Sequence, residues 1–585
     1  MDSLRQKLIG LINATKRKKP YRCEVEYLES TGKQYIDTGY NIISSTDEVS
    51  CYFQLITSDK YFWLMGEHDN GARFGIGSGD GTNLRNIAYG ASTYKVNDTE
   101  VYNSQHYFNS NSNGVYVNGT LVHAYENFTS TSTVYLFNLN ISGGGNAASG
   151  KIWRFTHKRN GKVIRDFIPV LDWNDKPAMY DKVSGELFYN QGTDVDFSYG
   201  REIHRVEYIE STGTQYINTK VKLNSNSSVE LDYQLTQASQ TRKGLFGNLT
   251  SGMSARFGSL LSPSNQYLEH GYGAANVYWQ QGMPDTDRHV LKQVKNVVYF
   301  DGTLINTFDN ATFSITDDAP LGNFNYTNYT PALAKYYRSK WWDNDTLVRD
   351  YIPAIDENGV GFMFDRVTHS CFLNAGTGDF KYSPKELYYI GSTGTQYINT
   401  NFYPNEKTKI EIVGSVLPDN PPACFCATRW SQSPTYDTYG AYYNFAQNEK
   451  RFVCYYGRYS DEQYDQVPNT QFNFLQGFFK YTQDKNVLTL EGIDFDGYYT
   501  KTFTNTAFQA TTYPLWLFRF NAGSSTFNTK GVKIRTAKIW DDGTLIKDYV
   551  AAYKDGVLGM YDRVNNVFYQ NAGTGTFIVG KIKEK

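Results

Sequence analysis

The 585-residue sequence lacks several features that would assign it to a large class of proteins. It has no run of about 18 or more apolar residues, so we expect no transmembrane helix. Lys and Arg number 57 against 59 Asp and Glu, so there is no overall basic field and we expect no nucleic-acid partner. Proline is scarce, with 16 residues, whereas 49 tyrosines and 50 glycines favour an all-β chain of short strands and turns.

Cysteine is also scarce and unevenly placed. The six positions are Cys23, Cys51, Cys371, Cys424, Cys426 and Cys454. A disulfide framework shared by repeated domains would itself repeat, and this arrangement does not. The pattern therefore predicts free, mostly buried thiols. Zinc is the alternative at Cys424 and Cys426, although no second cysteine pair matches them. Reduced thiols fit a protein that folds in a cytoplasm.

One nine-residue motif occurs three times at equal spacing. STGTQYINT is found at residues 211–219 and 392–400, and the near copy STGKQYIDT at residues 30–38. The copies start 181 residues apart in both cases, and a unit of that length can bury its own core. We therefore predict three tandem domains. The predicted ranges are 1–20 for a separate N-terminal segment, 21–200 for the first repeat, 201–384 for the second and 385–585 for the third.

A second shared block closes each repeat. It starts at a basic–acidic pair, which is Arg165-Asp166, Arg349-Asp350 or Lys547-Asp548. Neighbouring strand residues point to opposite faces, so we expect each pair to make structural contacts rather than one site. The block then predicts a hairpin with a two-residue turn at Ser184-Gly185, Thr368-His369 or Asn565-Asn566. Thr-His suits such a turn poorly, which predicts a wider turn in the second repeat.

The middle of each repeat varies more than its two ends. Asn118-Gly119 and Asp301-Gly302, each between alternating apolar residues, predict hairpins in the first and second repeats. The third repeat has a longer middle that includes PPACFCATRWSQSPTYDTYGAYYNF from Pro421. Variable loops on a constant scaffold are where binding usually occurs, so we expect any binding site in these middle regions.

The paired motifs resemble a known family. An opening EYIxSTGTQYIxT with a closing RDFIP…YDxVxxxFYxNAGTGxF resembles the concanavalin A-like lectin/glucanase superfamily, in its laminin-G-like branch. Modules of this pattern are found in tailed-phage virion proteins and in surface proteins of gut bacteria. The resemblance covers residues 25–580 and implies a jelly-roll sandwich of two antiparallel sheets in each repeat. It also implies that the first and last strands of each domain lie side by side, so that the repeated motifs close the domain.

Some members of that superfamily are glycosidases with a Glu-x-Asp-x-Glu-like cluster on one strand. Retaining hydrolysis needs two carboxyl groups about 5–5.5 Å apart. The second repeat has Glu230 and Asp232 but Gln234 at the third place, and the third repeat has Glu411 alone. The corresponding places in the first repeat are Ser50, Tyr52 and Gln54. We therefore expect the chain not to be an enzyme.

The candidate carbohydrate-binding residues are aromatic. Sugar rings present apolar faces that stack on tryptophan, and Trp63, Trp279 and Trp430 lie in or near the variable middle regions. The alternative is that each packs in the core. Aspartates and asparagines in loops leave calcium open, but no carboxylate cluster repeats, so we expect no cofactor and no metal site.

The N-terminal segment differs from the rest of the chain. Leu4, Leu8, Leu11 and Ile12 recur at helical intervals and predict one amphipathic helix that needs a partner for its apolar face. The order of charges is not that of a signal peptide. We expect an anchor that inserts into a larger assembly, with self-association into a trimer left open. A helix on a membrane surface is the alternative, given the basic cluster at residues 16–19.

These observations predict a non-enzymatic structural and adhesion protein of a bacteriophage particle. The helix would attach to capsid or tail proteins, as in a head fibre or a capsid decoration, and three lectin-like domains would contact glycans. The alternatives are a carbohydrate-binding adhesin of the bacterial cell surface and, less favoured, a glycoside hydrolase.

Overall fold

The computed structural model of the chain describes most of the three repeats. The described residues are 19–56, 62–69, 71–78, 84–97, 104–141, 147–193, 195–238, 240, 242–250, 254–262, 267–279, 284–326, 329–417, 423–432, 435–444, 451–457, 464–504, 508, 512–523, 531–554 and 557–579. The predicted N-terminal helix, with Leu4, Leu8, Leu11 and Ile12, lies outside them.

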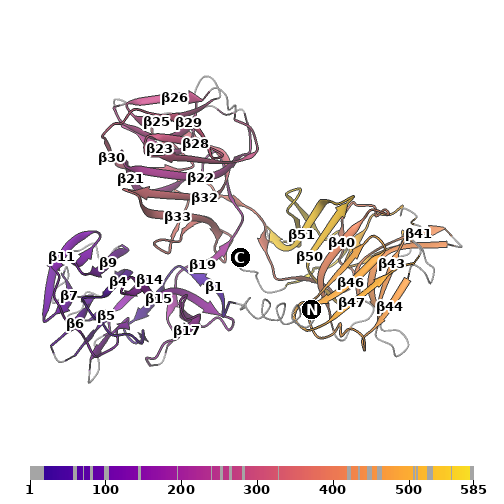
Figure 1. Cartoon of the computed structure of the whole chain (residues 1–585), viewed down its shortest axis with the longest axis horizontal. Coiled ribbons are helices and arrows are strands. Elements are labelled where there is room, and N and C mark those ends of the chain that lie inside the picture. The colour runs from indigo at the N-terminus through magenta and orange to yellow at the C-terminus, as the bar shows by residue number, and fades with distance from the viewer. Residues whose placement is uncertain are drawn as a thin grey trace. The chain divides into compact units, whose positions relative to one another are not determined.

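The described chain is all-β, as predicted (Figure 1). Its strands form antiparallel sheets with a few short parallel pairings, such as that between β5 (Trp63–His68) and β13 (Leu139–Ile141). No helix occurs in the described ranges. Accordingly, none of their elements is a helix long and apolar enough to cross a membrane.

The described strands form five sheets of 22, 7, 7, 11 and 7 strands. The first eleven strands of the large sheet belong to the first repeat: β1 (Tyr21–Val25), β2 (Leu28–Thr31), β4 (Asp47–Leu55), β9 (His106–Asn111), β10 (Gly114–Val117), β11 (Thr120–Ala124), β14 (Ser149–Arg159), β15 (Lys162–Asp172), β16 (Pro177–Asp181), β17 (Glu186–Phe188) and β18 (Ser198–Tyr199). Its other eleven belong to the second: β19 (Glu202–Arg205), β20 (Ile209–Thr212), β22 (Ser227–Leu235), β27 (Arg288–Val294), β28 (Val297–Phe300), β29 (Thr303–Thr307), β32 (Leu333–Asp343), β33 (Thr346–Ile355), β34 (Gly361–Asp365), β35 (Ser370–Phe372) and β36 (Lys381–Tyr382).

The seven-stranded sheets recur once in each repeat. In the first repeat the sheet contains β3 (Ile36–Asp37), β5, β6 (Arg73–Ser78), β7 (Leu84–Gly90), β8 (Ser92–Asn97), β12 (Tyr135–Leu136) and β13. In the second it contains β21 (Ile217–Asn224), β23 (Lys243–Leu249), β24 (Arg256–Leu261), β25 (Leu268–Gly273), β26 (Ala275–Trp279), β30 (Ser314–Leu321) and β31 (Thr330–Pro331). In the third it contains β39 (Ile398–Asn399), β41 (Ala423–Gln432), β42 (Thr435–Asn444), β43 (Arg451–Tyr456), β44 (Tyr464–Pro468), β48 (Trp516–Leu517) and β49 (Phe520–Asn521).

The eleven-stranded sheet completes the third repeat. Its strands are β37 (Lys385–Glu386), β38 (Ile390–Ser392), β40 (Lys409–Val416), β45 (Phe479–Asp484), β46 (Val487–Gly492), β47 (Tyr498–Thr502), β50 (Val532–Asp541), β51 (Thr544–Lys554), β52 (Val557–Asp562), β53 (Val567–Gln570) and β54 (Ile578–Val579).

Each repeat has a large hydrophobic core made by residues of two sheets. The three main core clusters fall within residues 23–197, 206–380 and 387–577. Side chains alternate between buried and part-exposed along β22, as expected of a strand with one face on a core. In the second repeat Phe246 of β23 packs edge-on against Trp341 of β32, with ring centroids 6.0 Å apart. Contacts of this kind join two antiparallel layers, which is the arrangement of a β-sandwich.

The repeated opening motif forms a small hydrogen-bonded turn. In the second repeat the side-chain oxygen of Gln215 accepts hydrogen bonds from the Thr212 amide at 2.8 Å and the Ser211 hydroxyl at 3.2 Å. The next residue, Tyr216, donates its amide to Asn374 of the closing block at 3.1 Å. Since β20 also pairs with β36, the opening and closing segments lie side by side, as predicted.

The predicted hairpins of the middle regions are confirmed. In the first repeat Val117 pairs with Thr120, so Asn118-Gly119 forms a two-residue turn, and both of its residues have positive φ. Asp301-Gly302 makes the same turn in the second repeat, also with both φ angles positive. A turn of this shape matches the twist of the strands that it joins.

The predicted two-residue turns of the closing block are wrong. Asp181 pairs directly with Glu186, which leaves a four-residue loop, and Asp365 with Ser370 and Asp562 with Val567 do the same. The aspartate at the start of each loop explains the longer turn, because its carboxylate accepts a hydrogen bond from the backbone amide two residues later at 3.1–3.2 Å. The wider turn predicted for the second repeat is therefore confirmed, and the loops of the other two repeats have the same length.

The first strand begins earlier than Val25, where the resemblance starts. β1 begins at Tyr21, and the indole nitrogen of Trp173 donates to the backbone oxygen of Lys19 at 3.1 Å. The chain separates into two compact units, Met1–Tyr382 and Ser383–Lys585. Inside the first unit β1 pairs with β19, so the first two repeats share one sheet. The three-domain boundaries therefore stay a prediction.

Candidate functional site

The recurring basic–acidic pairs of the closing block do not each form one site. In the second repeat Arg349 lies 3.7 Å from Asp365, whereas its neighbour Asp350 accepts two hydrogen bonds from Arg338 at 2.9 and 3.0 Å. The first repeat has the matching contacts Arg165–Asp181 and Arg154–Asp166, and the third has Lys547–Asp562 and Lys538–Asp548. The two members of each pair therefore have different partners, and their role is structural.

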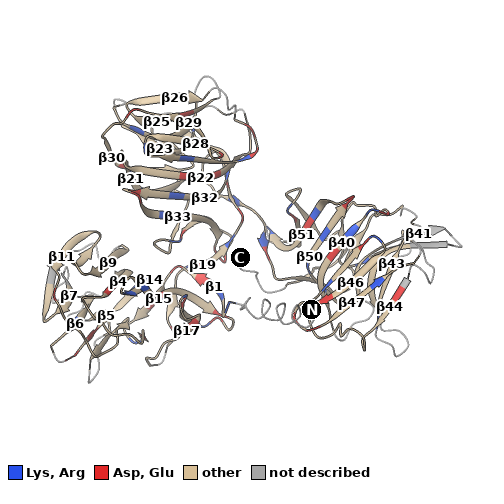
Figure 2. Ribbon diagram, in the orientation of Figure 1, with Lys and Arg blue, Asp and Glu red and all other residues tan. Residues whose placement is uncertain are grey.

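The carboxylates considered for catalysis lie on β22, and each has a cationic partner. Glu230 lies 3.2 Å from Lys292 and 3.4 Å from Lys340. Arg288 donates two hydrogen bonds to Asp232, both at 2.8 Å. Burial opposes ionisation of Glu230, but the two lysines outweigh it and lower the pKa of this carboxyl below its ordinary value. Figure 2 shows Lys and Arg interspersed with Asp and Glu along the strands.

The strand register confirms which positions correspond to Glu230 and Asp232 in the other repeats. Ser50 and Tyr52 occupy the same places on β4 relative to β14, as the sequence alignment predicted. In the third repeat the places fall on Glu411 and Val413 of β40. No pair of carboxylates therefore recurs at these positions.

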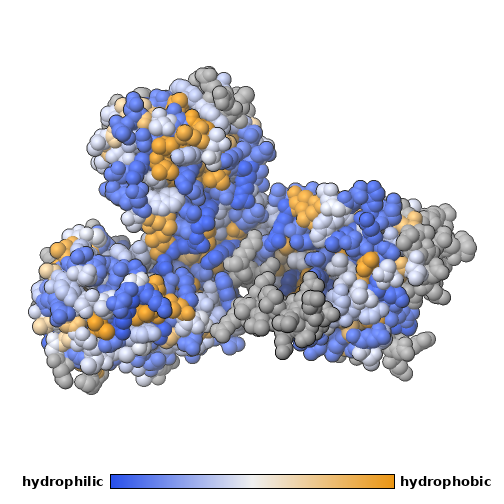
Figure 3. Space-filling view, viewed as in Figure 1, coloured by the Kyte–Doolittle hydropathy of each residue, from blue (hydrophilic) through white to orange (hydrophobic). Residues whose placement is uncertain are grey.

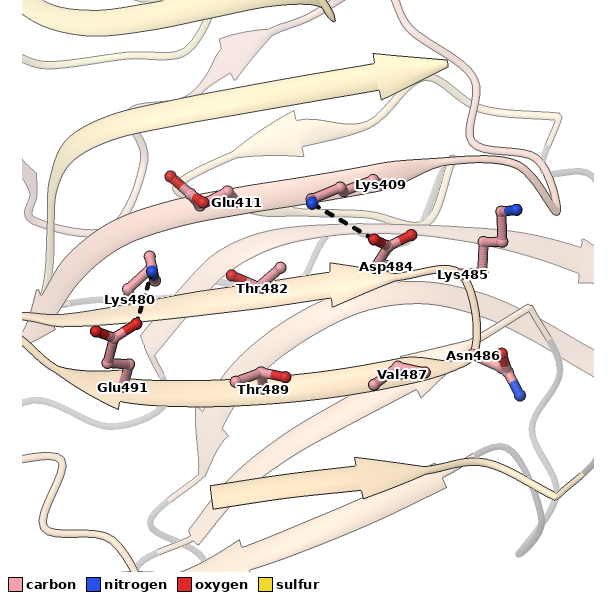
Figure 4. Close-up of a pocket in the computed structure, with 10 residues that line it drawn as sticks. All are labelled: Lys409, Glu411, Lys480, Thr482, Asp484, Lys485, Asn486, Val487, Thr489 and Glu491. Atoms are coloured by element: carbon pink, nitrogen blue, oxygen red, sulfur yellow. Dashed lines mark ion pairs between the residues drawn. The ribbon is translucent and has the colours of Figure 1, made fainter. Parts of the chain in front are cut away.

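The outer face around Glu411 is an open, polar surface of the third repeat, with a cavity volume of about 530 Å³ (Figure 4). Lys409 of β40 pairs with Asp484 of β45 at 3.4 Å, and Lys480 of β45 pairs with Glu491 of β46 at 2.6 Å. No aromatic side chain is among the ten residues that line it. None of these ten lining residues therefore offers a ring on which a sugar could stack.

The three candidate tryptophans have different surroundings. Trp63 is only 9% exposed and packs with Ala88 and Leu139, so it is a core residue and no longer a candidate. Trp279 is half-buried and packs against Phe300 with ring centroids 4.7 Å apart. The backbone of Trp430 lies in β41, and its side chain lies outside the described ones. A sugar-stacking role for Trp279 and Trp430 stays a prediction.

A more suitable pocket lies on the outer face of the seven-stranded sheet of the second repeat. It has a volume of about 260 Å³ and is lined by Leu249, Arg256, Gly258, Leu260, Glu269, Gly271, Asn276, Tyr278, Phe324, Tyr326 and Tyr329. Alternation along β25 places Glu269 and Gly271 in the pocket, while Tyr272 points into the main core. β26, which carries Asn276 and Tyr278, is the edge strand of this sheet (Figure 1).

Glu269 is the central polar group of this pocket. Glu269 is 7% exposed, and its Oε1 atom accepts a hydrogen bond from Asn276 Nδ2 at 2.8 Å. Arg256 Nη1 reaches the same oxygen at 3.5 Å. Burial raises the pKa of Glu269 above its ordinary value, and Asn276 and Arg256 offset this only in part.

Aromatic rings form one side of the pocket. Tyr326 and Tyr329 lie with ring centroids 6.2 Å apart, and Phe324 lies 5.7 Å from Tyr329. Tyr278 is 42% exposed, so this residue is partly open to solvent. These residues were not among the predicted carbohydrate-binding residues, which were all tryptophans. The tyrosine-rich stretch NFNYTNYT at residues 323–330 of the variable middle region is the signal that could have found them.

The described residues contain no group of three or more His, Cys, Asp or Glu side chains placed to hold a metal ion. All six cysteines are free, and five of them are buried, as predicted. Figure 3 shows hydrophobic residues only in small, separate groups on the face in view.

We compared the chain with protein families, curated proteins and solved structures, and only the solved structures gave matches. No protein-family model matches the sequence, and no curated protein matches it. Domains LG4-5 of the mouse laminin α1 chain share 14% identity at a TM-score of 0.20, over 61% of this chain and 98% of that one. The LG1-3 region of the laminin α2 chain shares 9% identity at a TM-score of 0.22, over 95% of this chain and 100% of that one. Both of these solved structures contain tandem laminin G-like domains, whereas the fold of this chain is established by its own sheets and cores.

Proposed function

We propose that this chain is a non-enzymatic structural and adhesion protein of a bacteriophage particle. The N-terminal segment attaches it to capsid or tail proteins, as in a head fibre or a capsid decoration. Three jelly-roll sandwiches, over residues 21–200, 201–384 and 385–585, present lectin-like surfaces to glycans of the host or its surroundings. The motif resemblance to modules of tailed-phage virion proteins supports the particle, and the pocket around Glu269 supports glycan binding.

The observation that best supports a non-enzymatic function is that both carboxylates of β22, Glu230 and Asp232, are ion-paired with basic side chains. A glycosidase of this fold needs one carboxyl group that holds a proton and a second that stays ionised nearby. Lys292 and Lys340 instead favour the ionised form of Glu230, and Arg288 holds both oxygens of Asp232. Glu230 is therefore not prepared to donate a proton to a leaving group, and both oxygens of Asp232 already accept hydrogen bonds.

Quantitative mass spectrometry of purified particles tests the proposed location. We expect peptides from all three repeats to co-purify with capsid or tail proteins through a density gradient, at a constant ratio to them. Recovery of the chain from the envelope of uninfected bacteria, and not from particles, would favour the surface-adhesin alternative instead.

A further inference from the structure

We propose that the pocket formed by β24, β25 and β26 of the second repeat binds one terminal sugar residue of a neutral glycan. In this arrangement Glu269 accepts hydrogen bonds from sugar hydroxyls, and the ring of Tyr278 stacks on the apolar face of the sugar. The inference rests on the proposed glycan-binding function and names its site and its ligand class.

The size and charge of the pocket define the ligand class. Its volume of about 260 Å³ is below the roughly 300–1,000 Å³ of pockets that enclose drug-sized ligands. It therefore suits a single ring at the end of a chain. Its lining contains one cationic residue, Arg256, and one acidic residue, Glu269. These two are paired with each other, so the pocket offers no surplus positive charge for a sialylated or sulfated sugar.

Two polar atoms at the pocket have no hydrogen-bond partner among the described residues. Both donors to Glu269 contact Oε1, and no donor among the described residues contacts Oε2. The Nε atom of Arg256 is buried, and no described residue accepts a hydrogen bond from it. A carboxylate oxygen beside a guanidinium donor matches neighbouring hydroxyl groups of a sugar, each of which both donates and accepts.

The backbone around the pocket is adapted to this arrangement. A Cβ atom at Gly271 would lie 2.5 Å from Cδ of Arg256, so glycine at this position leaves room for the arginine stem. The stem thereby directs the guanidinium towards Glu269. Tyr278 occupies the position directly opposite Glu269 on β26 and is partly exposed to solvent.

The other repeats have the same strands but not these side chains. In the first repeat the strand register places Asn86 where the second has Glu269, and Lys95 where it has Tyr278. In the third repeat the same two places hold Val453 and Gln466. The described strands therefore carry this combination of a carboxylate and an aromatic ring in the second repeat alone, which predicts one such site per chain.

Binding of neutral and acidic oligosaccharides to the full-length chain tests the inference. The probes are glucose-, galactose- and mannose-terminated oligosaccharides, with sialylated and sulfated versions of each, measured by isothermal titration calorimetry. The variants are Glu269→Gln and Tyr278→Ala. The control is Tyr498→Ala, which removes a tyrosine that is 67% exposed on β47 of the third repeat. Urea unfolding establishes that each variant is folded.

We expect a neutral probe to bind the wild-type chain and the control equally. Each pocket variant should bind it at least about tenfold more weakly, because Glu269→Gln weakens a charge-assisted hydrogen bond and Tyr278→Ala removes the ring on which the sugar stacks. Should Glu269→Gln fail to fold, Gly271→Ala serves instead, because its Cβ displaces only the flexible Arg256 stem and should weaken binding similarly.

The remaining outcomes separate the inference from the proposed function. Neutral-glycan binding that both pocket variants retain would overturn the inference and leave the proposed function standing. Binding of acidic probes alone would overturn the neutral ligand class. Absence of binding to every probe by the wild-type chain would contradict the proposed function as well.

Discussion

The side-chain oxygen of Gln34 accepts a hydrogen bond from the backbone amide of Thr31 at 2.9 Å. The same bond joins Thr212 to Gln215 and Thr393 to Gln396, both at 2.8 Å. Gln34 is fully buried, and the glycine between the two residues has a positive φ, which glycine adopts without strain. This turn explains why the chain carries nearly the same nine residues three times: they hold the first strands of each repeat against its last.

Gln34→Leu should destabilise the first repeat. The substitution keeps a side chain of similar size but leaves the Thr31 amide without its side-chain acceptor and removes the shorter of the two hydrogen bonds donated by the Ser30 hydroxyl. We expect the free energy of unfolding to fall by about 1–3 kcal/mol, measured by urea denaturation. Gln191→Leu, at an exposed glutamine of the same repeat, is the matched control and should change stability little. Equal effects of both variants would mean that the turn contributes nothing specific.

The strands and the repeat pattern could be predicted from the sequence because they are local properties. Alternation of buried residues and the Asn118-Gly119 turn depend on neighbours in the chain. The length of the closing turn was predicted wrongly because it is set by Asp181, which lies before the residues that form the loop. The pocket could not be predicted, since Arg256, Glu269 and Tyr326 meet only through strand register and the return of a distant loop.

The stability of the first repeat should depend on the protonation of Glu67, a buried residue of β5. Burial, together with repulsion from Asp69, raises its pKa to about 8. The folded state therefore binds a proton that the unfolded state releases above its lower, ordinary pKa. Stability due to this group is complete below the ordinary pKa and is lost as pH rises towards 8. We expect urea midpoints of the wild-type chain to fall between pH 5 and about pH 8.

Glu67→Gln should remove most of that loss, because an amide needs no proton to be neutral. The control is Glu186→Gln, at an exposed glutamate of the same repeat, which should leave the pH dependence unchanged. A midpoint of the Glu67→Gln variant that falls with pH as steeply as that of the wild type would show that another group is responsible.

Glu230→Gln and Asp232→Asn should not affect any turnover of polysaccharides, since we expect none. Their ion pairs with Lys292 and Arg288 are partly exposed, so each variant should also change stability only modestly, by about 0–1 kcal/mol. Reducing-end assays against a broad polysaccharide panel check the first expectation, and urea denaturation checks the second. Turnover by the wild-type chain that either variant abolishes would make β22 a catalytic strand.

Removal of residues 1–18 should leave the three repeats folded and abolish incorporation into particles. The truncation stops before Lys19 because its backbone oxygen accepts the indole hydrogen bond of Trp173. Leu8→Asp with Leu11→Asp should have the same effect, since it places charge in the apolar stripe of the predicted helix. Protein retained on particles after gradient purification is the measurement, with Lys7→Ala as a control that spares the stripe. Wild-type retention of the truncated chain would mean that the repeats make the attachment.

The central claim is that the chain binds glycans without cleaving them. Its most direct test is to incubate the full-length chain with a neutral oligosaccharide that it retains, then to release the ligand and determine its mass. We predict saturable retention that Tyr278→Ala weakens, and a released oligosaccharide of unchanged mass. Shortened products that depend on Glu230, or no retention of any glycan in the panel, would contradict it.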